Sequence, residues 1–176
     1  MADITFNSAA GQTIDRDRLI AYLNTGTESS PVWSPLGKRV EDSSVEYDFD
    51  SNTRRDVLGH TYGSMKKPIV TQEFDPWPFD GGDAAQVKIW NLAVKDQDVA
   101  ALAALDMLIV HFYAGTAATP FAERWSACMI ELSELGGEGG GEITGGFAVT
   151  YGGTRTTGTA SRNAETGVVT FTADSN

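Results

Sequence analysis

Glycine is concentrated in one stretch of the chain, and this concentration sets the strongest limit on the fold. Ten of the nineteen glycines fall between Gly136 and Gly158, and such a density disfavours a helix because glycine loses more conformational freedom on folding than any other residue. The residues from Phe147 to Tyr151 are mostly β-branched or aromatic, which favours a strand. The stretch therefore predicts a loop that leads into a strand.

The same stretch does not fit a loop that binds phosphate groups. In the dinucleotide-binding pattern G-x-G-x-x-G, either Glu142 or Thr144 would occupy the position of the third glycine. A Walker-type loop needs a lysine after its last glycine, and the chain contains no lysine after Lys95. A nucleotide site is therefore not expected here.

The overall charge and the rest of the composition exclude several classes of protein. The 176 residues are enough for one domain, and their formal net charge is −11. This acidic excess repels phosphates and argues against tight nucleic-acid binding. The single cysteine, Cys128, cannot form an intramolecular disulfide. Because the sequence also shows no secretory signal and no apolar run long enough to span a bilayer, we expect folding in a reducing cytoplasm without membrane binding.

One segment, from about 83 to 105, has the spacing of a helix. On a helical wheel Val87, Ile89, Trp90, Ala93 and Val94 share one arc, which we expect to face the core. The aspartate at the start of the segment is a suitable N-cap, with a glutamine three residues on in the manner of a capping box. Further strands are predicted at 107–114, 124–132, 143–151, 154–161 and 167–172.

The segment Ser44–Asp50 alternates between apolar and acidic residues. Its apolar side chains lie on one face, and Glu46, Asp48 and Asp50 lie on the other, as expected of a half-buried strand with an acidic outer face. A turn-like stretch separates it from 67–74, so a long hairpin is predicted over about 44–75. The fold class is therefore mainly β, an antiparallel sandwich or barrel flanked by one helix.

No pattern in the sequence supports catalysis or metal binding. His60, His111 and Cys128 are far apart and lack the spacing of metal ligands. Neither histidine is accompanied by a nucleophile motif such as G-x-S-x-G, and His111 lies within a predicted strand, where a packed or interface role is favoured. We expect no catalytic residues, no metal and no cofactor.

Blocks spread over nearly the whole chain carry a family resemblance through their order and combination. They are Leu19–Thr27 with Pro31–Gly37, the acidic hairpin, Gln72–Asp83, Leu108–Gly115, and Leu135–Gly141 followed by Val149–Thr159. Together they resemble the major tail proteins, or tail tube proteins, of long-tailed, siphovirus-type bacteriophages. The resemblance implies a single tail-tube domain over 1–176, a β-sandwich flanked by one helix, and no C-terminal immunoglobulin-like domain.

The resemblance also implies a structural function in the virion. Proteins of this family assemble, in the host cytoplasm, as hexameric rings that stack around the tape-measure protein, and strands join across subunits to line a channel for DNA ejection. Tail terminator and tail-tip proteins are further expected partners, and a non-contractile tail is favoured over a sheathed one. DNA would pass through the channel without specific binding.

Seven charged residues are candidates for the lumen or for subunit interfaces. An electronegative lumen would let DNA slide without sticking, and the acidic alternation of the hairpin is a candidate for it. The glycine-rich loop is expected to be mobile in the free subunit and to be ordered by a neighbour in the tube. The candidates are Glu46, Asp48, Asp50, Arg54, Arg55, Glu138 and Glu142.

Two alternatives remain open from the sequence. One is a tube protein of a contractile tail or injection device, because such proteins share the fold. The other is a monomeric carbohydrate-binding or adhesin β-sandwich, in which exposed Trp33 and Trp77 would stack on sugars. The missing export signal argues against the second.

Overall fold

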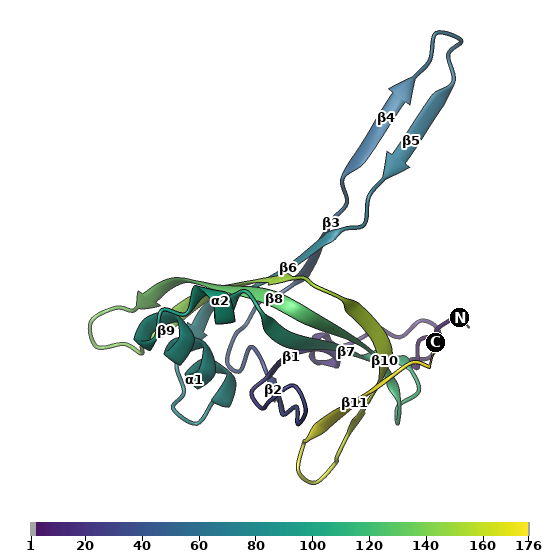
Figure 1. The fold of residues 1–176 in the computed structure, drawn as a ribbon. Helices are drawn as coiled ribbons and strands as arrows, with labels where there is room; N and C mark the ends of the chain where they lie inside the picture. Colours follow the sequence, from purple (N-terminus) through teal and green to yellow (C-terminus); the bar gives the residue numbers. More distant parts are fainter. Residues whose placement is uncertain (1–2, 176) are drawn as a thin grey trace.

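The computed structural model describes residues 3–175 and shows a mainly β fold, as the sequence predicts (Figure 1). All strand pairs in this range are antiparallel. The strands are β1 (Leu19–Asn24), β2 (Trp33–Pro35), β3 (Val45–Asp48), β4 (Ser51–Arg55), β5 (Thr61–Met65), β6 (Ile69–Pro78), β7 (Leu105–Gly115), β8 (Pro120–Gly136), β9 (Thr144–Tyr151), β10 (Arg155–Arg162) and β11 (Val169–Ala173).

The long strand β8 connects two parts of the main sheet, whose order is β2-β1-β7-β8-β9-β6-β3. The first half of β8 pairs with β7 on one side and with β10 on the other, and the last β7 pair joins Leu105 to Cys128. From Met129 onward β8 pairs with β9, which lies on the β10 side. The second half of β8 therefore forms a four-stranded sheet with β9, β6 and β3.

Two hydrophobic clusters lie on opposite faces of β7. Met107 and Ile109 point into the larger cluster, which also contains residues of β1, β6, β8, β9 and the helix. Leu108 and Val110 point into the smaller cluster, which the β10–β11 hairpin covers. All four side chains are fully buried, so β7 is the central strand of the fold.

The helical segment is less regular than the helix predicted over about 83–105. It consists of α1 (Ala84–Trp90), a π-helical turn (Asn91–Lys95) and α2 (Val99–Leu102). Asp83 caps α1, since its Oδ1 accepts hydrogen bonds from the backbone N–H groups of Ala85 (3.0 Å) and Gln86 (3.1 Å). Instead of closing a capping box, the Gln86 side chain accepts from the N–H of Asp80 (2.7 Å) and donates to the carbonyl of Pro78 (2.8 Å).

The expected core-facing arc of the helix was wrong in part. Ile89 is buried as expected, but Val87 is 44% exposed and Trp90 is 38% exposed. The physical reason is that the two hydrogen bonds of Gln86 satisfy its amide in the interior, so that α1 presents Ala85, Gln86 and Ile89 to the core. A hydropathy wheel assigns glutamine to the solvent side and therefore misjudges the rotation of the helix.

The predicted long hairpin is present and projects away from the body (Figure 1). β3 pairs with β6 at the edge of the main sheet, and β4 and β5 pair only with each other. We call residues 50–67, which form this ribbon and its base, the arm. The expected half-buried alternation was wrong beyond Val45, because Tyr47 and Phe49 are 47% and 49% exposed. The chain leaves the body at this point, and no second layer covers these side chains.

The contrast between two tryptophans gives a direct test of the packing. Trp77 is fully buried and contacts Phe74 and Phe147 at ring-centroid distances of 5.5 and 5.1 Å. We expect Trp77→Ala to lower the free energy of unfolding by about 3–5 kcal/mol through loss of packing. The matched variant Trp90→Ala should cost less than about 1 kcal/mol in the free subunit. Urea denaturation of both variants measures the difference, and equal losses would show that the helix is rotated as the sequence pattern suggested.

Candidate assembly surfaces

The four-stranded sheet has one uncovered face, and that face is acidic. Cross-strand pairing puts Glu46, Thr71, Thr150 and Met129 in one row across β3, β6, β9 and β8. Within this four-stranded sheet, β3, β6, β9 and residues 129–136 of β8 contain no lysine or arginine. We call this surface the acidic face; the exposed carboxylates of its strands are Glu46, Asp48, Glu73, Asp75, Glu131 and Glu134.

The same sheet has an unpaired edge on each side among the described residues. β3 pairs only with β6, so its outer edge is open. Beyond Cys128 no strand pairs with β8 on the β7 side; the short helix α2 makes some contacts with β8. Open backbone N–H and C=O groups along a strand are a template for pairing with another chain. Both edges border the acidic face.

The seven charged residues singled out from the sequence fall into three separate places. Glu46 and Asp48 lie on the acidic face. Asp50, Arg54 and Arg55 belong to the arm, where Asp50 forms an ion pair with Lys66 (2.5 Å) and the Arg55 Nε donates to the carbonyl of Gly59 (3.1 Å).

The other two candidates, Glu138 and Glu142, lie in the loop between β8 and β9, at the opposite end of the strands from the arm (Figure 1). Glu142 is 3.9 Å from Arg39, between Oε2 and Nη1, while both side chains remain largely exposed. As the sequence predicts, the glycine-rich stretch is a loop that leads into a strand, since β9 begins at Thr144. The candidates therefore do not form a single site.

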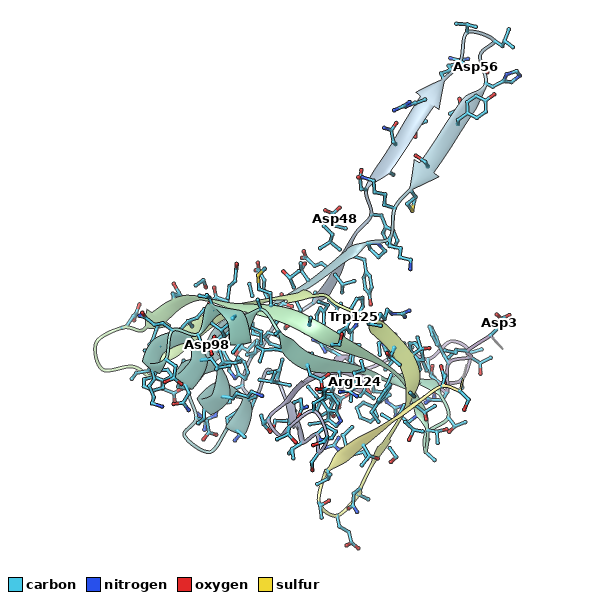
Figure 2. All side chains as sticks on the ribbon, viewed as in Figure 1. Asp3, Asp48, Asp56, Asp98, Arg124 and Trp125 are labelled. Atoms are coloured by element: carbon cyan, nitrogen blue, oxygen red, sulfur yellow. The ribbon has the colours of Figure 1, made fainter. Side chains whose placement is uncertain are left out.

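The tip of the arm is a polar turn that displays two apolar side chains (Figure 2). Oδ1 of Asp56 accepts hydrogen bonds from the N–H groups of Leu58 and His60, both at 2.9 Å. The backbone hydrogen bond from His60 is the largest of several that hold the pKa of Asp56 below its usual value. Val57 is fully exposed and Leu58 is 78% exposed. The turn thus has a defined shape without burying its apolar residues.

A buried carboxylate, which sequence reasoning did not single out, holds β7, β8 and β10 together. Glu123 accepts from Arg155 Nε (2.5 Å) and lies 2.8 Å from His111 Nε2. Burial raises the pKa of Glu123, but these partners outweigh it and leave the pKa lowered. His111 Nδ1 also contacts the Tyr113 hydroxyl (2.9 Å), whose pKa burial and Glu123 raise. His111 is buried among these partners, as expected of a packed histidine.

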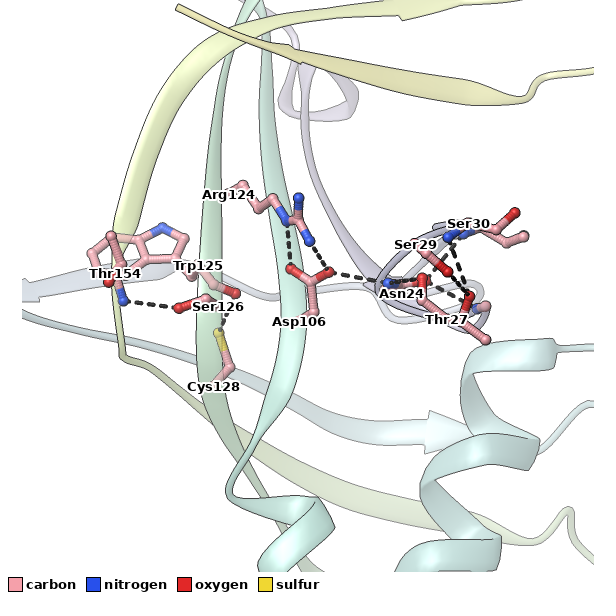
Figure 3. Close-up of polar contacts among 12 residues, drawn as sticks. Asn24, Thr27, Ser29, Ser30, Asp106, Arg124, Trp125, Ser126, Cys128 and Thr154 are labelled. Atoms are coloured by element: carbon pink, nitrogen blue, oxygen red, sulfur yellow. Dashed lines mark hydrogen bonds and ion pairs between the residues drawn. The ribbon is translucent and has the colours of Figure 1, made fainter. Parts of the chain in front are cut away.

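A second polar network, also missed, fixes the turn between β1 and β2 (Figure 3). Asp106 accepts two hydrogen bonds from Arg124, both at 2.8 Å, and a third from the Asn24 amide at 3.0 Å. Asn24 Oδ1 in turn accepts from the backbone N–H groups of Gly26 and Val32. An isolated aspartate in the apolar run 105–110 was the only signal for this network. It shapes a loop and offers no open coordination site.

The described part of the chain gives little support for a metal site, a reactive cysteine or a sugar-binding surface. Residues 3–175 contain no cluster of three or more His, Cys, Asp or Glu side chains suited to a metal ion. Burial raises the pKa of the Cys128 thiol to about 12, as expected of a packed cysteine. Trp33 is 7% exposed and Trp77 is fully buried, so the sugar-stacking surface required by the carbohydrate-binding alternative is absent at these residues.

None of the helices in the described range combines the length and the apolar character needed to span a bilayer.

Comparison with known proteins finds a similar fold among solved structures. No family model and no curated protein matches the sequence. A similar fold occurs in a chain of the extracellular contractile injection system structure described as PVC sheath/tube terminator in extended state. Its TM-score is 0.50 and its identity 12%, with 85% of this chain and 99% of that chain covered.

Two further solved structures show weaker likenesses, with TM-scores below 0.5. One is the anti-feeding prophage cap, described as a tube terminating cap, with a TM-score of 0.45 and 15% identity over 88% of this chain and 96% of that chain. The other is the PVC sheath-tube complex in extended state, with a TM-score of 0.47 and 11% identity over 85% and 94%. At these identities the comparison establishes the fold alone: the chain shares its fold with a component of an extracellular contractile injection system.

Proposed function

We propose that the chain is a structural subunit of a phage-tail-type assembly, in which copies close a ring through the two open edges of the four-stranded sheet. The observation that carries this proposal is the pair of unpaired edges, on β3 and on β8 from Met129 to Gly136, which border one uncovered face. In the ring, β3 of one copy pairs with β8 of the next. Closure leaves no open edge in that sheet, which removes an aggregation liability.

The strand directions are compatible with such a junction. β8, β9, β6 and β3 alternate in direction because each neighbouring pair is antiparallel. With an even number of alternating strands, β3 of one copy and β8 of a rotated copy also run antiparallel. The contact joins two different surfaces, and such a head-to-tail contact gives a ring when the rotation closes.

The number of strands in a ring is large enough for a channel. Four strands from each of six copies would close a barrel of about 24 strands, and barrels of roughly 16–18 strands already enclose an aqueous channel. Six is the number implied by the resemblance to tail tube proteins. In this arrangement the clustered side chains of the body, including α1, lie outside the barrel wall.

The acidic face would line the channel. β3, β6, β9 and residues 129–136 of β8 carry carboxylates and no lysine or arginine, so a ring of copies would present a strongly negative wall. Such a wall repels the phosphates of DNA and lets it pass without adhering. This gives Glu46 and Asp48 the lumen role expected from the sequence, whereas Asp50 is paired with Lys66 at the base of the arm.

The position of the subunit in the tail has two candidates. The resemblance of the sequence favours the repeating tube subunit of a non-contractile tail, in contact with tape-measure and tail-tip proteins. The structural neighbour with a TM-score of 0.50, described as a sheath/tube terminator, favours a ring that ends a tube. Both are parts of a virion or tail-like particle. Unlimited stacking of rings distinguishes the first from the second.

Electron microscopy of the concentrated protein tests ring formation. We expect annular particles with six-fold symmetry; long tubes would favour the repeating subunit, and single or paired rings the terminating one. Ammonium sulfate strengthens the burial of apolar surface and should increase the fraction of rings. A chain that remains a single copy under all these conditions would contradict the proposal, and glycan binding by that single copy would favour the carbohydrate-binding alternative.

The charge of the proposed channel wall can be tested separately with assembled particles. We expect the triple variant Glu46→Lys, Glu73→Lys, Glu131→Lys to retain double-stranded DNA in a salt-dependent manner, while wild-type particles do not. The matched control is Glu28→Lys, Glu41→Lys, Glu165→Lys, which makes the same charge change at exposed positions outside the acidic face. DNA retention measured by gel shift should be equal for control and wild type. Equal retention by both triple variants would remove the acidic face from the channel.

A further inference from the structure

The body has two layers of strands that meet on one side only. Strand β8 belongs to both layers, because its first half pairs with β7 and its second half pairs with β9. From β8 one layer continues through β7 and β1 to β2, and the other continues through β9 and β6 to β3. The larger hydrophobic cluster lies between the layers. The body is therefore closed along β8 and open between β2 and β3.

A cavity of about 720 Å³ occupies this open side, and we call it the mouth. It lies between β1, β2, β6, the loop 36–43 and the start of α1. Its apolar floor is part of the larger hydrophobic cluster or packs against it, and consists of Leu19, Ala21, Leu36, Val40 and Phe74. A single copy leaves this part of the core open to solvent, which favours an apolar occupant.

The rim of the mouth has a fixed shape. Arg39 has a φ of 67°, which is uncommon outside glycine, and the Val40 N–H donates to the carbonyl of Gly37 (3.0 Å). Farther along the rim, the Ser43 hydroxyl accepts a hydrogen bond from Gln72 Nε2 (2.9 Å). The mouth is thus formed before any partner binds, which limits the ordering cost of docking.

The opposite side of the body carries a projecting segment at the start of α2, residues 96–100, which we call the corner. Gln97 has a φ of 51°, and with Arg39 it is one of two non-glycine residues in the range 3–175 that have a positive φ. The Asp98 N–H donates to the carbonyl of Leu92 (2.9 Å), and the Asp98 side chain caps α2. Val99 extends from the corner and is 76% exposed. The corner therefore presents an apolar side chain on a defined backbone.

The mouth and the corner lie at the same level of the four-stranded sheet. Strand register places Gln72, which lines the mouth, in the row of Ile130 of β8. α2 contacts β8 and leads to Leu105, which pairs with Cys128 just before that row. Both features lie opposite the acidic face, since both border the larger hydrophobic cluster. When β3 of one copy pairs with β8 of the next, the mouth beside β3 faces the corner beside β8.

One charge at the mouth is available for the corner. The Arg16 guanidinium donates to two backbone carbonyls and forms no ion pair among residues 3–175. Asp98, next to Val99 in the corner, is a matching acid. Asp17 and Glu41 also line the mouth, so the charge match is local to Arg16 and the apolar contact dominates.

We propose that the corner of one copy inserts into the mouth of its neighbour in the ring, with Val99 against the apolar floor. This inference rests on the proposed function, because closure through β3 and β8 is what brings the corner to the next mouth. β3 has only four residues, so its backbone pairing forms a short ladder. The inserted corner adds buried apolar area to that junction and fixes the angle between neighbouring copies.

A cross-linking experiment tests this contact directly. The chain has one cysteine, Cys128, which is buried, so introduced surface thiols react selectively. The double variant Val40→Cys, Val99→Cys has its two thiols on opposite sides of one copy, so that a disulfide between them must join two copies. We expect mild oxidation to give a ladder of covalent multimers that ends at the closed ring on a non-reducing gel.

Matched controls identify the contact. The single variants Val40→Cys and Val99→Cys should give no species beyond the dimer. The double variant Val40→Cys, Val168→Cys places the second thiol at an exposed position next to β11, outside the corner, and should give no ladder. If thermal melting shows that the first pair is affected in folding, Glu41→Cys with Ala100→Cys tests the same contact at two exposed positions.

A charge placed on the corner tests the same contact without cross-linking. We expect Val99→Asp to lower the fraction of subunits in rings about tenfold at equal protein concentration, because a carboxylate replaces a valine that docking buries. Val168→Asp, the same change at an exposed site outside the corner, should leave that fraction unchanged. Equal ring fractions for the two variants would overturn insertion of the corner.

Electron microscopy of the cross-linked samples separates this inference from ring closure. Rings together with the ladder support both. Rings without a ladder above the control level would overturn insertion of the corner and leave closure through β3 and β8 intact. A ladder without rings would overturn ring closure and retain the contact, and the absence of both would overturn both.

Discussion

The pairing of β8 is the constraint on which the rest of the structure depends. Its first half lies between β7 and β10, where Glu123 joins His111 and Arg155 in the interior. Its second half continues past the last β7 pair and supports β9, β6 and β3 on one side only. The first half of β8 thus belongs to the body with its two hydrophobic clusters, and the second half begins a sheet with open edges. In a single copy the edge groups of the open sheet are left to solvent, and they are available for pairing with another chain.

The open strand edges and the exposed apolar side chains of a single copy lie around the acidic face. The open edges run along the two sides of the acidic face, while the arm and the exposed apolar side chains of α1 lie at its two ends. These edges and ends are separate surfaces of the subunit. The body is well packed around residues 107–110 of β7, whereas a substantial apolar surface on the arm and on α1 is exposed.

Local sequence patterns predicted much of the fold. The predictions were wrong where contacts between distant parts of the chain determine the structure. The strands from β7 to β11, the hairpin, the Asp83 cap and the loop before β9 follow from alternation, capping and glycine content. The rotation of α1 could not be predicted because it depends on two hydrogen bonds of the Gln86 side chain, which accepts from the N–H of Asp80 and donates to the carbonyl of Pro78. Tyr47 and Phe49 have the pattern of buried residues, and no local signal tells that their cover is missing. Charge patterns marked Glu46 and Asp48, whereas Glu73 and Glu131 join them only through strand register.

Hydrogen exchange measured by mass spectrometry, before and after assembly, tests ring closure through these edges most directly. Our account predicts that amides in 45–48 and 129–136 exchange quickly on their open sides in the single copy and become protected in the assembled particle. Amides in 107–110 of β7 serve as an internal reference, because they are protected in both states. Unchanged exchange at both edges in assembled particles would contradict closure through β3 and β8, even if the particles were rings.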